Sequence, residues 1–466
     1  MTEPQFRELT GSAEDLAFLE RLYGEIYVPE FPNPDERESL ENMRRYLRLK
    51  AEGWYGPNGY HIVVMLSDGA PVGLSISDYL SLPKAGVIEF LVIAQPARGS
   101  GCGSRLLACT EALFAGDAAR NGEKLSCIAA EMNDPFRSPL DDSLDPFRRA
   151  CVWSGWGYGR LDFPYVQPAL DAGKGAVANL LLMAKPALPE LAQAFPAKLV
   201  DGILRNYMIW AMRIAEPETA PVYRAMRRHL DAHPSIALRS LGAYVGRDPA
   251  KPLDIHEVAG RNDPDAAPVL SVYRRAFPGG PTNVDPDVFL RCAGTAGYHL
   301  WALRREAAAV VEGMASFFGL QVAGFGGYVA LTGSLRRTGR FALLLARMEE
   351  AMRRDGPSAR GLCIECDPAK ESFFRAFGFR TVDLTYRQPP LPGDRAYDPD
   401  EAPPLLLMYK DFGRNYETPL MSVADFLAAM RAILSAVYGI SANSPFVDDL
   451  ERQASRWPGA TVAFRP

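Results

Sequence analysis

The most informative stretch of the chain lies between residues 87 and 104. An apolar run, Val87 to Ile93, is followed by Arg98-Gly-Ser-Gly101-Cys-Gly103 and then by a helical pattern that starts at Ser104. A strand that leads through a glycine-rich turn into a helix directs several backbone N–H groups, and the positive end of the helix dipole, at one point in space. This pattern predicts a binding site for a phosphate group.

Two common phosphate loops do not fit this stretch. A nucleotide P-loop needs Lys and then Ser or Thr after its last glycine, and a dinucleotide fingerprint needs three glycines spaced G-x-G-x-x-G with an acidic residue about 20 positions later. The spacing Arg98-x-x-Gly101-x-Gly103 resembles instead the pyrophosphate loop of the GNAT acyltransferases, which holds the diphosphate of coenzyme A. A glycine-rich turn can also be a tight turn that binds no ligand. A second feature is therefore needed to distinguish the two possibilities.

The second feature is an internal repeat. Gly59-Tyr60-His61 recurs as Gly297-Tyr298-His299, and Arg98 recurs as Arg336, both at a distance of 238 positions (297 − 59 and 336 − 98). Further on, the segment 162–170 recurs as 383–391 at a distance of 221 (383 − 162). Several ordered landmarks of this kind indicate two homologous copies.

The aromatic ends of both copies also resemble the last helix and strand of the GNAT fold. They read Val152-Trp153-Ser-Gly-Trp-Gly157-Tyr158 and Glu371-Ser-Phe373-Phe374-Arg-Ala-Phe-Gly378-Phe379. The fold expected is therefore α/β (α+β), with two tandem GNAT-like domains, each a mixed, mostly antiparallel sheet flanked by helices. The expected division is a catalytic N-terminal domain at 1–185, a helical linker at 186–252, and a degenerate C-terminal domain with terminal helices at 253–466.

The resemblance also implies which residues bind and react. Acetyl-CoA, or another acyl-CoA, is the expected co-substrate, with its diphosphate at the loop and its pantetheine arm and thioester along the backbone of the preceding strand. The residues expected to bind it are Leu91, Val92, Ile93, Arg98, Gly99, Ser100, Gly101, Cys102, Gly103 and Ser104. Cys102 is poorly placed to form an acyl intermediate among these amides, so direct transfer to the amine is favoured.

Glu89 is the candidate general base. Many members of the family carry a carboxylate at this place on the strand, and a carboxylate within an apolar strand has a raised pKa unless it is paired, which suits a base. The alternative is a Glu at a strand edge paired with an Arg. Many members of the family have a Tyr that acts as the general acid where Trp153 and Phe374 stand in this chain. The proton for the leaving thiolate must therefore come from Tyr165, Tyr158 or solvent, and Tyr165 is the chosen candidate.

The second copy departs from the pattern where chemistry is expected. Its loop reads Arg336-Arg-Thr-Gly339-Arg-Phe341, so Phe341 stands in place of Gly103, and Gly327 stands in place of Glu89. A bulky side chain at the helix start removes the close approach that glycine allows. The first copy is therefore expected to be catalytic and the second to be a scaffold or to shape the substrate site; weak binding of coenzyme A by the second copy stays open.

Composition narrows the class of protein. The 466 residues are 48% hydrophobic and 23% charged, with a net charge of −5, which indicates a globular protein and argues against a nucleic-acid partner. We find no uninterrupted apolar run of membrane-spanning length and no signal-peptide pattern, and an odd number of cysteines, seven, favours the cytoplasm. Cys363-Ile-Glu-Cys366 lacks a second cysteine pair, so no metal is expected.

The function expected is acyl-CoA-dependent N-acylation, most simply acetylation, of a primary amine of a small molecule, by a monomer or a homodimer. An acidic stretch, Asp134 to Asp145, could form a lid for a cationic amine, although such loops are usually only solvated. Two rival functions remain. One is a non-catalytic protein that senses acyl-CoA, and the other is a tandem-GNAT aminoacyl transferase that uses charged transfer RNA, against which the acidic charge and the intact loop argue.

Overall fold

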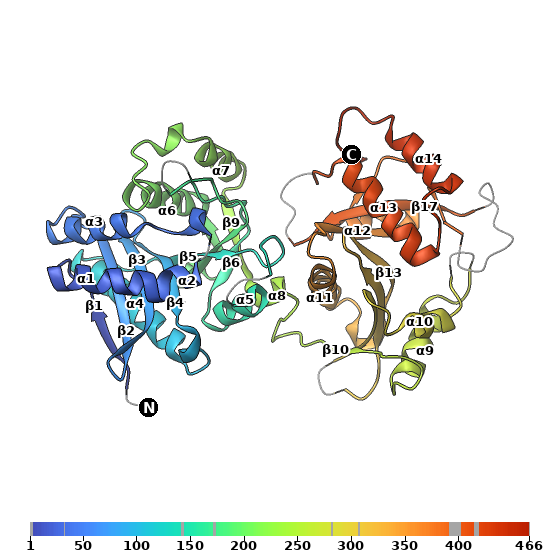
Figure 1. Ribbon diagram of the computed structural model, residues 1–466, viewed down its shortest axis with the longest axis horizontal. Coiled ribbons are helices and arrows are strands. Elements are labelled where there is room, and N and C mark those ends of the chain that lie inside the picture. Colours follow the sequence, from blue (N-terminus) through green and yellow to red (C-terminus); the bar gives the residue numbers. More distant parts are fainter. Residues whose placement is uncertain are drawn as a thin grey trace. The chain divides into compact units, whose positions relative to one another are not determined.

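A computed structural model of the chain describes residues 3–31, 33–140, 144–170, 174–280, 283–305, 308–390, 402–413 and 419–465. The chain forms two compact units. The first comprises Met1–Asp134 and Ser143–Leu241, and the second comprises Pro135–Asp142 and Gly242–Pro466 (Figure 1). No helix among the described residues is both long enough and apolar enough to cross a membrane.

The first unit is built on a nine-stranded sheet in the order β1-β2-β3-β4-β5-β7-β6-β9-β8. Strands β4 and β5 run parallel, and the other neighbouring pairs are antiparallel. The strands are β1 (Gln5–Glu8), β2 (Gly59–Ser67), β3 (Ala70–Leu80), β4 (Ala85–Ile93), β5 (Cys127–Asn133), β6 (Gly159–Leu161), β7 (Leu180–Pro186), β8 (Ala194–Pro196) and β9 (Ser235–Ser240).

Helices cover both faces of this sheet because successive apolar side chains of its central strands point to opposite faces. On β2, Ile62 and Val64 pack with the helices near the N-terminus, whereas Val63 and Met65 pack with the helix that follows β4. Side chains alternate across a strand, so one short run supplies both layers. The helices are α1 (Ala13–Leu22), α2 (Val28–Glu30), α3 (Leu40–Ala51), α4 (Cys102–Arg120), α5 (Pro146–Gly155), α6 (Ala197–Trp210) and α7 (Pro221–Ala232).

The second unit repeats this plan with an eight-stranded sheet in the order β10-β11-β12-β13-β14-β17-β15, in which β13 and β14 run parallel and β16 also pairs with β17. The strands are β10 (Asp254–Glu257), β11 (Tyr298–Arg304), β12 (Gly313–Gly319), β13 (Gly324–Leu331), β14 (Gly361–Cys366), β15 (Arg380–Thr381), β16 (Tyr386–Arg387) and β17 (Pro404–Asp411). The helices are α8 (Leu241–Tyr244, at the boundary), α9 (Ala266–Ala276), α10 (Asp287–Cys292), α11 (Arg340–Asp355), α12 (Glu371–Arg375), α13 (Val423–Tyr438) and α14 (Pro445–Ala454). The predicted fold class, two mixed and mostly antiparallel sheets with flanking helices, is confirmed.

The repeat continues beyond the landmarks found in the sequence. The N–H of Ala197 at the start of α6 donates to the carbonyl of Pro234, and the N–H of Val423 at the start of α13 donates to the carbonyl of Ala460, both over 2.9 Å. Both residues of the pair are shifted by 226 positions (423 − 197 and 460 − 234). Each copy therefore includes a terminal helical pair and a returning extended segment, so the duplication covers nearly the whole chain.

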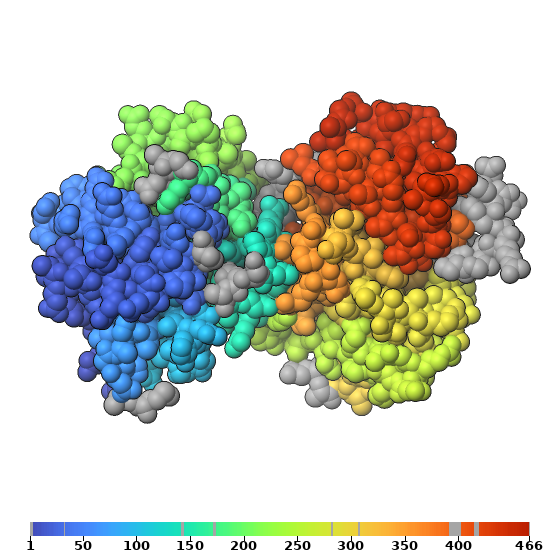
Figure 2. Space-filling view, viewed as in Figure 1, coloured from blue at the N-terminus to red at the C-terminus, as the bar shows by residue number. Residues whose placement is uncertain are grey.

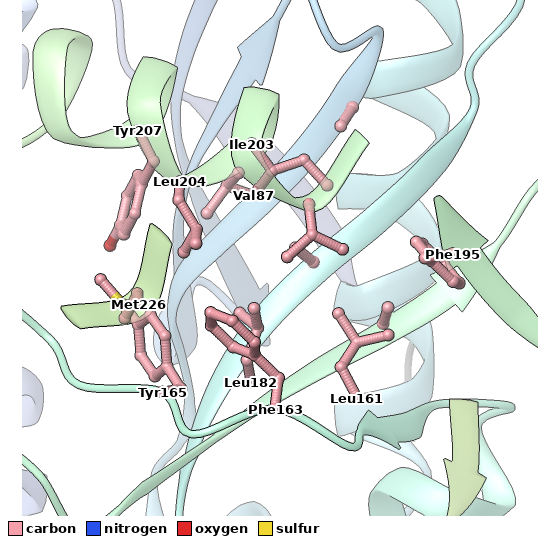
Figure 3. Packing of buried hydrophobic residues seen from close by; sticks show 14 of the residues in the cluster. Val87, Leu161, Phe163, Tyr165, Leu182, Phe195, Ile203, Leu204, Tyr207 and Met226 are labelled. Carbon is pink, nitrogen blue, oxygen red and sulfur yellow. The ribbon is translucent and has the colours of Figure 1, made fainter. Parts of the chain in front are cut away.

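The helices that follow Lys185 belong to the first unit, which ends at Leu241, whereas the sequence analysis expects this domain to end at residue 185. Helix α6 lies across the sheet, and Ile203, Leu204 and Tyr207 point from it toward Val87 and Leu182 (Figure 3). With α7 it forms the green surface of the first unit in Figure 2. The amphipathic pattern of α6 is thus satisfied within this unit.

Each copy contains a histidine held between two carboxylates. The Nδ1 of His61 lies 2.7 Å from Glu8 Oε1 and its Nε2 lies 2.8 Å from Asp117 Oδ2, so this one ring joins β1, β2 and α4. His299 repeats the arrangement with Glu257 and Asp355, at 2.9 and 2.7 Å. Burial on its own would lower the pKa of His61, but the hydrogen bonds to Asp117 and Glu8 outweigh it, and the pKa is raised.

Replacing His61 with Gln should lower the free energy of unfolding by about 1–3 kcal/mol at pH 6 and by less at pH 9. A raised pKa in the folded state means that the imidazolium stabilises the fold fully below its unfolded pKa of about 6.5, and that this contribution is lost as the pH rises through the folded pKa. Urea unfolding at the two pH values measures both effects. His233→Gln, on an exposed ring, is the control, and an equal loss at both pH values for His61→Gln would contradict the assignment.

Candidate functional site

The predicted phosphate loop joins β4 to α4, and the helix begins two residues before the predicted Ser104. Strand β4 ends at Ile93, a 3-10 turn spans Gln95–Ala97, and α4 begins at Cys102. Gly99 and Gly101 have φ angles of 78° and 83°, in the left-handed region that favours glycine. A Cβ atom built on either glycine would meet no atom within 4 Å, so the space in front of the loop is open.

The backbone of this loop provides a set of unused donors. Among the described residues, no N–H group from Gly99 to Ser104 donates a hydrogen bond to another group of the chain. The first N–H groups of a helix lack partners within the helix, and Gly101 offers no side chain to cap them. The structure thus brings the N–H groups of the predicted loop residues together at the start of α4, an arrangement that suits an anion. These residues are Gly99, Ser100, Gly101, Cys102, Gly103 and Ser104.

Arg98 supports this loop from the side. Its Nε donates to the carbonyl of Ile93 over 3.0 Å, and its Nη2 forms an ion pair with Glu30 at the end of α2. The guanidinium therefore ties the loop to both the end of β4 and the segment that precedes α3. Its charge is matched by Glu30, whereas the sequence analysis expects it to attract the diphosphate.

The second unit keeps the backbone of the loop and changes its side chains. Arg337 and Gly339 have φ angles of 59° and 79°, and they stand 238 positions after Gly99 and Gly101 (337 − 99 and 339 − 101). Phe341, at the position of Gly103, packs its ring 4.7 Å from the ring of Phe377. In the first unit the corresponding space beside Gly103 is filled by Trp156, whose ring lies 3.1 Å from the site of a Cβ atom at 103.

Strands β4 and β5 part just before the loop. Their parallel register runs from Ala85 to Ile88 on β4, and no pairing with β5 is present among the described residues beyond Ile88. On its other edge β4 stays paired with β3, where Leu91, Val92 and Ile93 face Ser75, Leu74 and Gly73. The edge of β4 that faces β5 is thus open along the stretch where the pantetheine arm is expected.

Glu89 is the extra residue of a β-bulge. Ile76 pairs with Phe90 and Ser77 pairs with Ile88, so Glu89 has no partner residue on β3. A bulge turns the side chain of the inserted residue out of the regular alternation. The second unit has the same bulge, since Ser316 pairs with Tyr328 and Phe317 pairs with Gly326, and Gly327 is its extra residue.

Asp78 on β3 faces Glu89 on the same side of the sheet. Asp78 is 2% exposed, and its Oδ2 has no hydrogen-bond partner. Burial raises the pKa of Asp78 to about 6, a rise that a hydrogen bond with Glu89 limits. Burial also raises the pKa of Glu89 well above its usual value, and the neighbouring Asp78 raises it further. The two carboxyls form a pair that favours holding a proton.

Replacing Asp78 with Asn should stabilise the folded protein at pH 8 by about 1–3 kcal/mol. Carboxyls whose pKa is raised by folding bind more protons in the folded than in the unfolded state, so the wild-type protein loses stability as the pH rises from about 4 through the pKa of the pair. The neutral amide at residue 78 cannot ionise, so it removes the charge that Asp78 brings to the pair. Urea unfolding at pH 5 and pH 8 tests this, and a variant less stable than wild type at pH 8 would contradict the pairing.

Tyr165 lies in a different hydrogen-bonded group on this face. Its hydroxyl donates to Glu131 on β5, and Gln167 Nε2 donates to the other oxygen of Glu131 over 2.7 Å. Burial raises the pKa of Glu131 to about 7 and that of Tyr165 well above its usual value. Tyr165 is thus brought onto the face that holds Glu89, as a donor to a neighbouring carboxylate.

The second unit keeps this group. Tyr386 and Tyr438 donate to the two oxygens of Glu365 over 2.7 and 2.5 Å. Glu365 occupies the place of Glu131. Ile88 pairs with Ala130 in the first unit, and the matching Gly326 pairs with Ile364 in the second, so the next residues, Glu131 and Glu365, correspond. A carboxylate with its tyrosine is therefore common to both copies, whereas Glu89 occurs in only one.

Tyr158 points elsewhere. Its hydroxyl donates to Glu111 of α4 over 3.0 Å, and Lys185 donates to the same carboxylate. Trp153 lies edge-on to Tyr158 with ring centroids 4.8 Å apart. This group joins α4, α5 and β7 on the face opposite Glu89.

The remaining sequence candidates are a cysteine pair of the second unit and the acidic stretch Asp134 to Asp145. Cys363 and Cys366 are both free and buried. Within the described residues, His256, Asp263 and Asp265 are close enough to share a cation, but Asp265 is also paired with Arg304. The acidic stretch expected as a lid packs through Ser138, whose carbonyl accepts from Arg353 over 2.7 Å; its residues 141–143 lie outside the described residues.

Comparisons with known proteins yield solved structures only. No protein family model and no curated protein matches the chain. The chain is similar to a tandem GNAT protein from the clavulanic acid biosynthesis pathway, with 13% identity over 89% of this chain and 100% of that one and a TM-score of 0.29. It is also similar to a putative GNAT-family acetyltransferase from Bacteroides thetaiotaomicron (20% identity, 45% of this chain, 99% of that one, TM-score 0.33) and to a ribosomal-protein-alanine N-acetyltransferase from Brucella melitensis (18%, 39%, 99%, 0.27).

Proposed function

We propose that the first unit is an acyl-CoA-dependent N-acyltransferase that transfers an acetyl group directly to a primary amine of a small molecule. One observation carries the proposal: β4 presents Glu89 on a bulge and leads, through the turn at residues 94–98, into the loop of residues 99–104, whose N–H groups are unused. A base for the amine and an anchor for the diphosphate are thus joined by one short segment of the chain.

The residues of the site divide the work of the reaction. Acetyl-CoA supplies the thioester carbon that the amine attacks, and the N–H groups of residues 99–104 hold its diphosphate. The ammonium form of the acceptor gives one proton to the carboxylate of Glu89, because only the free amine has the lone pair that attacks. Backbone N–H groups on the open edge of β4, from Leu91 to Ile93, face the charge that develops on the thioester oxygen.

The second proton of the reaction leaves with the thiol. Attack on the carbon breaks the C–S bond, and the thiolate takes a proton to leave as free coenzyme A. We assign this proton to Tyr165 or to solvent. The attacking nitrogen loses its second proton to solvent as the amide forms, and solvent returns one proton to Tyr165. All seven cysteines are free, which favours a reducing compartment, and we place the protein in the cytoplasm.

Release of free thiol from acetyl-CoA in the presence of a panel of small primary amines tests the proposal. We expect thiol release that depends on the amine, with the acetylated amine detected by mass spectrometry. Tight binding of acetyl-CoA without turnover on any amine would favour a sensor of acyl-CoA instead, and turnover with the α-amine of ribosomal or other polypeptides alone would replace the small-molecule acceptor.

A further inference from the structure

The carboxyl pair formed by the buried Asp78 and the half-buried Glu89 has no counter-ion among the described residues. No Lys, Arg or His in the described part of the chain forms an ion pair or a hydrogen bond with either carboxylate. Arg213 lies in the same region, but its guanidinium stacks over the ring of Trp54 at 4.9 Å. An uncompensated negative charge in a protein interior is costly, so the arrangement is stabilised by any cation that enters it.

The pair is surrounded by tyrosines. Tyr60 on β2 is the direct cross-strand partner of Asp78, is 2% exposed, and has a hydroxyl without a hydrogen-bond partner. The ring of Tyr60 stacks with that of Tyr55 at 5.8 Å and meets that of Tyr46 edge-on at 5.6 Å. All three tyrosines interact electrostatically with Glu89. A group of aromatic rings near carboxylates favours an organic cation.

The fold itself does not require this pair. The residue of the second unit that corresponds to Asp78 is Phe318. Tyr60 pairs with Asp78 across the strands of the first unit, and the matching Tyr298 pairs with Phe318 in the second. Glu89 is matched with Gly327. Both carboxylates are thus replaced in the second unit. By contrast, Tyr60 is conserved there as Tyr298, and Glu131 is conserved as Glu365. The same sheet is built without the acidic pair, so a role in the architecture does not explain it.

We propose that Asp78 and Glu89 together form a recognition site for a primary alkylammonium group, in which Asp78 holds the cation while Glu89 accepts its proton. This inference rests on the proposed function and narrows the acceptor to an alkylamine that binds in its charged form. One N–H bond of the ammonium breaks and one O–H bond forms on Glu89; Asp78 exchanges no proton in this step. Arylamines, which are neutral at pH 7, and amines that carry a carboxylate beside the nitrogen are excluded.

Binding of n-butylammonium chloride to the full chain, saturated with coenzyme A, tests the site without turnover. Thermal unfolding is followed against ligand concentration, with 1-butanol as the neutral probe and sodium chloride at equal ionic strength as the salt control. We expect n-butylammonium to stabilise the wild-type protein and 1-butanol to leave it unchanged. Asp78→Asn should weaken the apparent affinity for the ammonium at least tenfold, whereas Glu365→Gln, a buried carboxylate of the other unit, should leave it unchanged.

The outcomes separate this inference from the proposed function. Equal binding of n-butylammonium by wild type and Asp78→Asn, no binding at all, or equal stabilisation by 1-butanol would each overturn the recognition site, even where acetyl transfer to some amine is observed. Binding that depends on Asp78 in a protein that acetylates no amine would leave the recognition site standing and remove the transferase. If Asp78→Asn fails to fold, Asp78→Glu, which keeps the charge and moves it, is expected to show the same loss.

Discussion

Replacing Glu89 with Gln should lower kcat for acetyl transfer by about 10²- to 10³-fold and leave the affinity for acetyl-CoA unchanged. Gln has nearly the same shape and fills the same bulge, but it cannot accept the proton of the ammonium. The acceptor then reacts only through the small fraction that is already deprotonated. Steady-state rates of thiol release, with acetyl-CoA binding measured separately by calorimetry, give the two quantities.

Glu365→Gln is the matched control for this variant. It removes a buried carboxylate from the equivalent face of the second unit, where burial raises the pKa to about 7, and it should not change kcat. A Glu89→Gln protein that keeps the wild-type kcat would show that Glu89 is not the base. A loss of acetyl-CoA binding in this variant would instead indicate that Glu89 supports the strand that leads into the loop, which begins ten residues later at Gly99.

Replacing Gly103 with Phe should weaken binding of acetyl-CoA about 100-fold, which corresponds to about 2.7 kcal/mol. The variant copies into the first unit the residue that Phe341 provides in the second. A Cβ atom at 103 already lies 3.1 Å from the ring of Trp156, so the larger ring is forced toward the exposed amides at the start of α4. Calorimetric titration of acetyl-CoA measures the change.

Phe341→Ala is the control for this prediction, because it alters the corresponding position of the unit that we expect not to bind. Its affinity for acetyl-CoA and its stoichiometry of one site should match those of wild type. Gly103→Ala, a milder change with the same contact, should give a smaller loss. Wild-type affinity in Gly103→Phe would mean that the diphosphate binds elsewhere.

The sequence predicts the fold through its repeat and predicts the loop through its glycines. Both signals are local. Gly99 and Gly101 have positive φ angles, which favour glycine, and a constant spacing survives divergence of side chains. The extent of each copy is not local. The periodicity of α6 shows that one face is buried, but the sheet that covers it, with Val87 and Leu182, comes from strands far away in sequence.

The partners of the site residues are also set by the three-dimensional pairing of strands. Asp78 is missed by the sequence analysis. It is the one charged residue in an alternating, otherwise apolar series, Leu74, Ile76, Asp78 and Leu80, and this pattern is itself a signal of a buried carboxylate. Its approach to Glu89 depends on a bulge that no local pattern reveals. In the same way, the repeat of Tyr165 as Tyr386 is visible in the sequence. The hydrogen bonds that these hydroxyls donate to Glu131 and Glu365 depend on the order of the strands in the sheet.

The central claim is that the backbone N–H groups of residues 99–104 in the first unit hold the diphosphate of coenzyme A. A crystal structure of the full chain grown with acetyl-CoA tests it most directly. The account predicts diphosphate oxygens within hydrogen-bonding distance of these N–H groups, with the thioester on the open edge of β4 beside Glu89. Density for the diphosphate at residues 337–342 of the second unit alone, or a first-unit loop left empty at saturating acetyl-CoA, would contradict it.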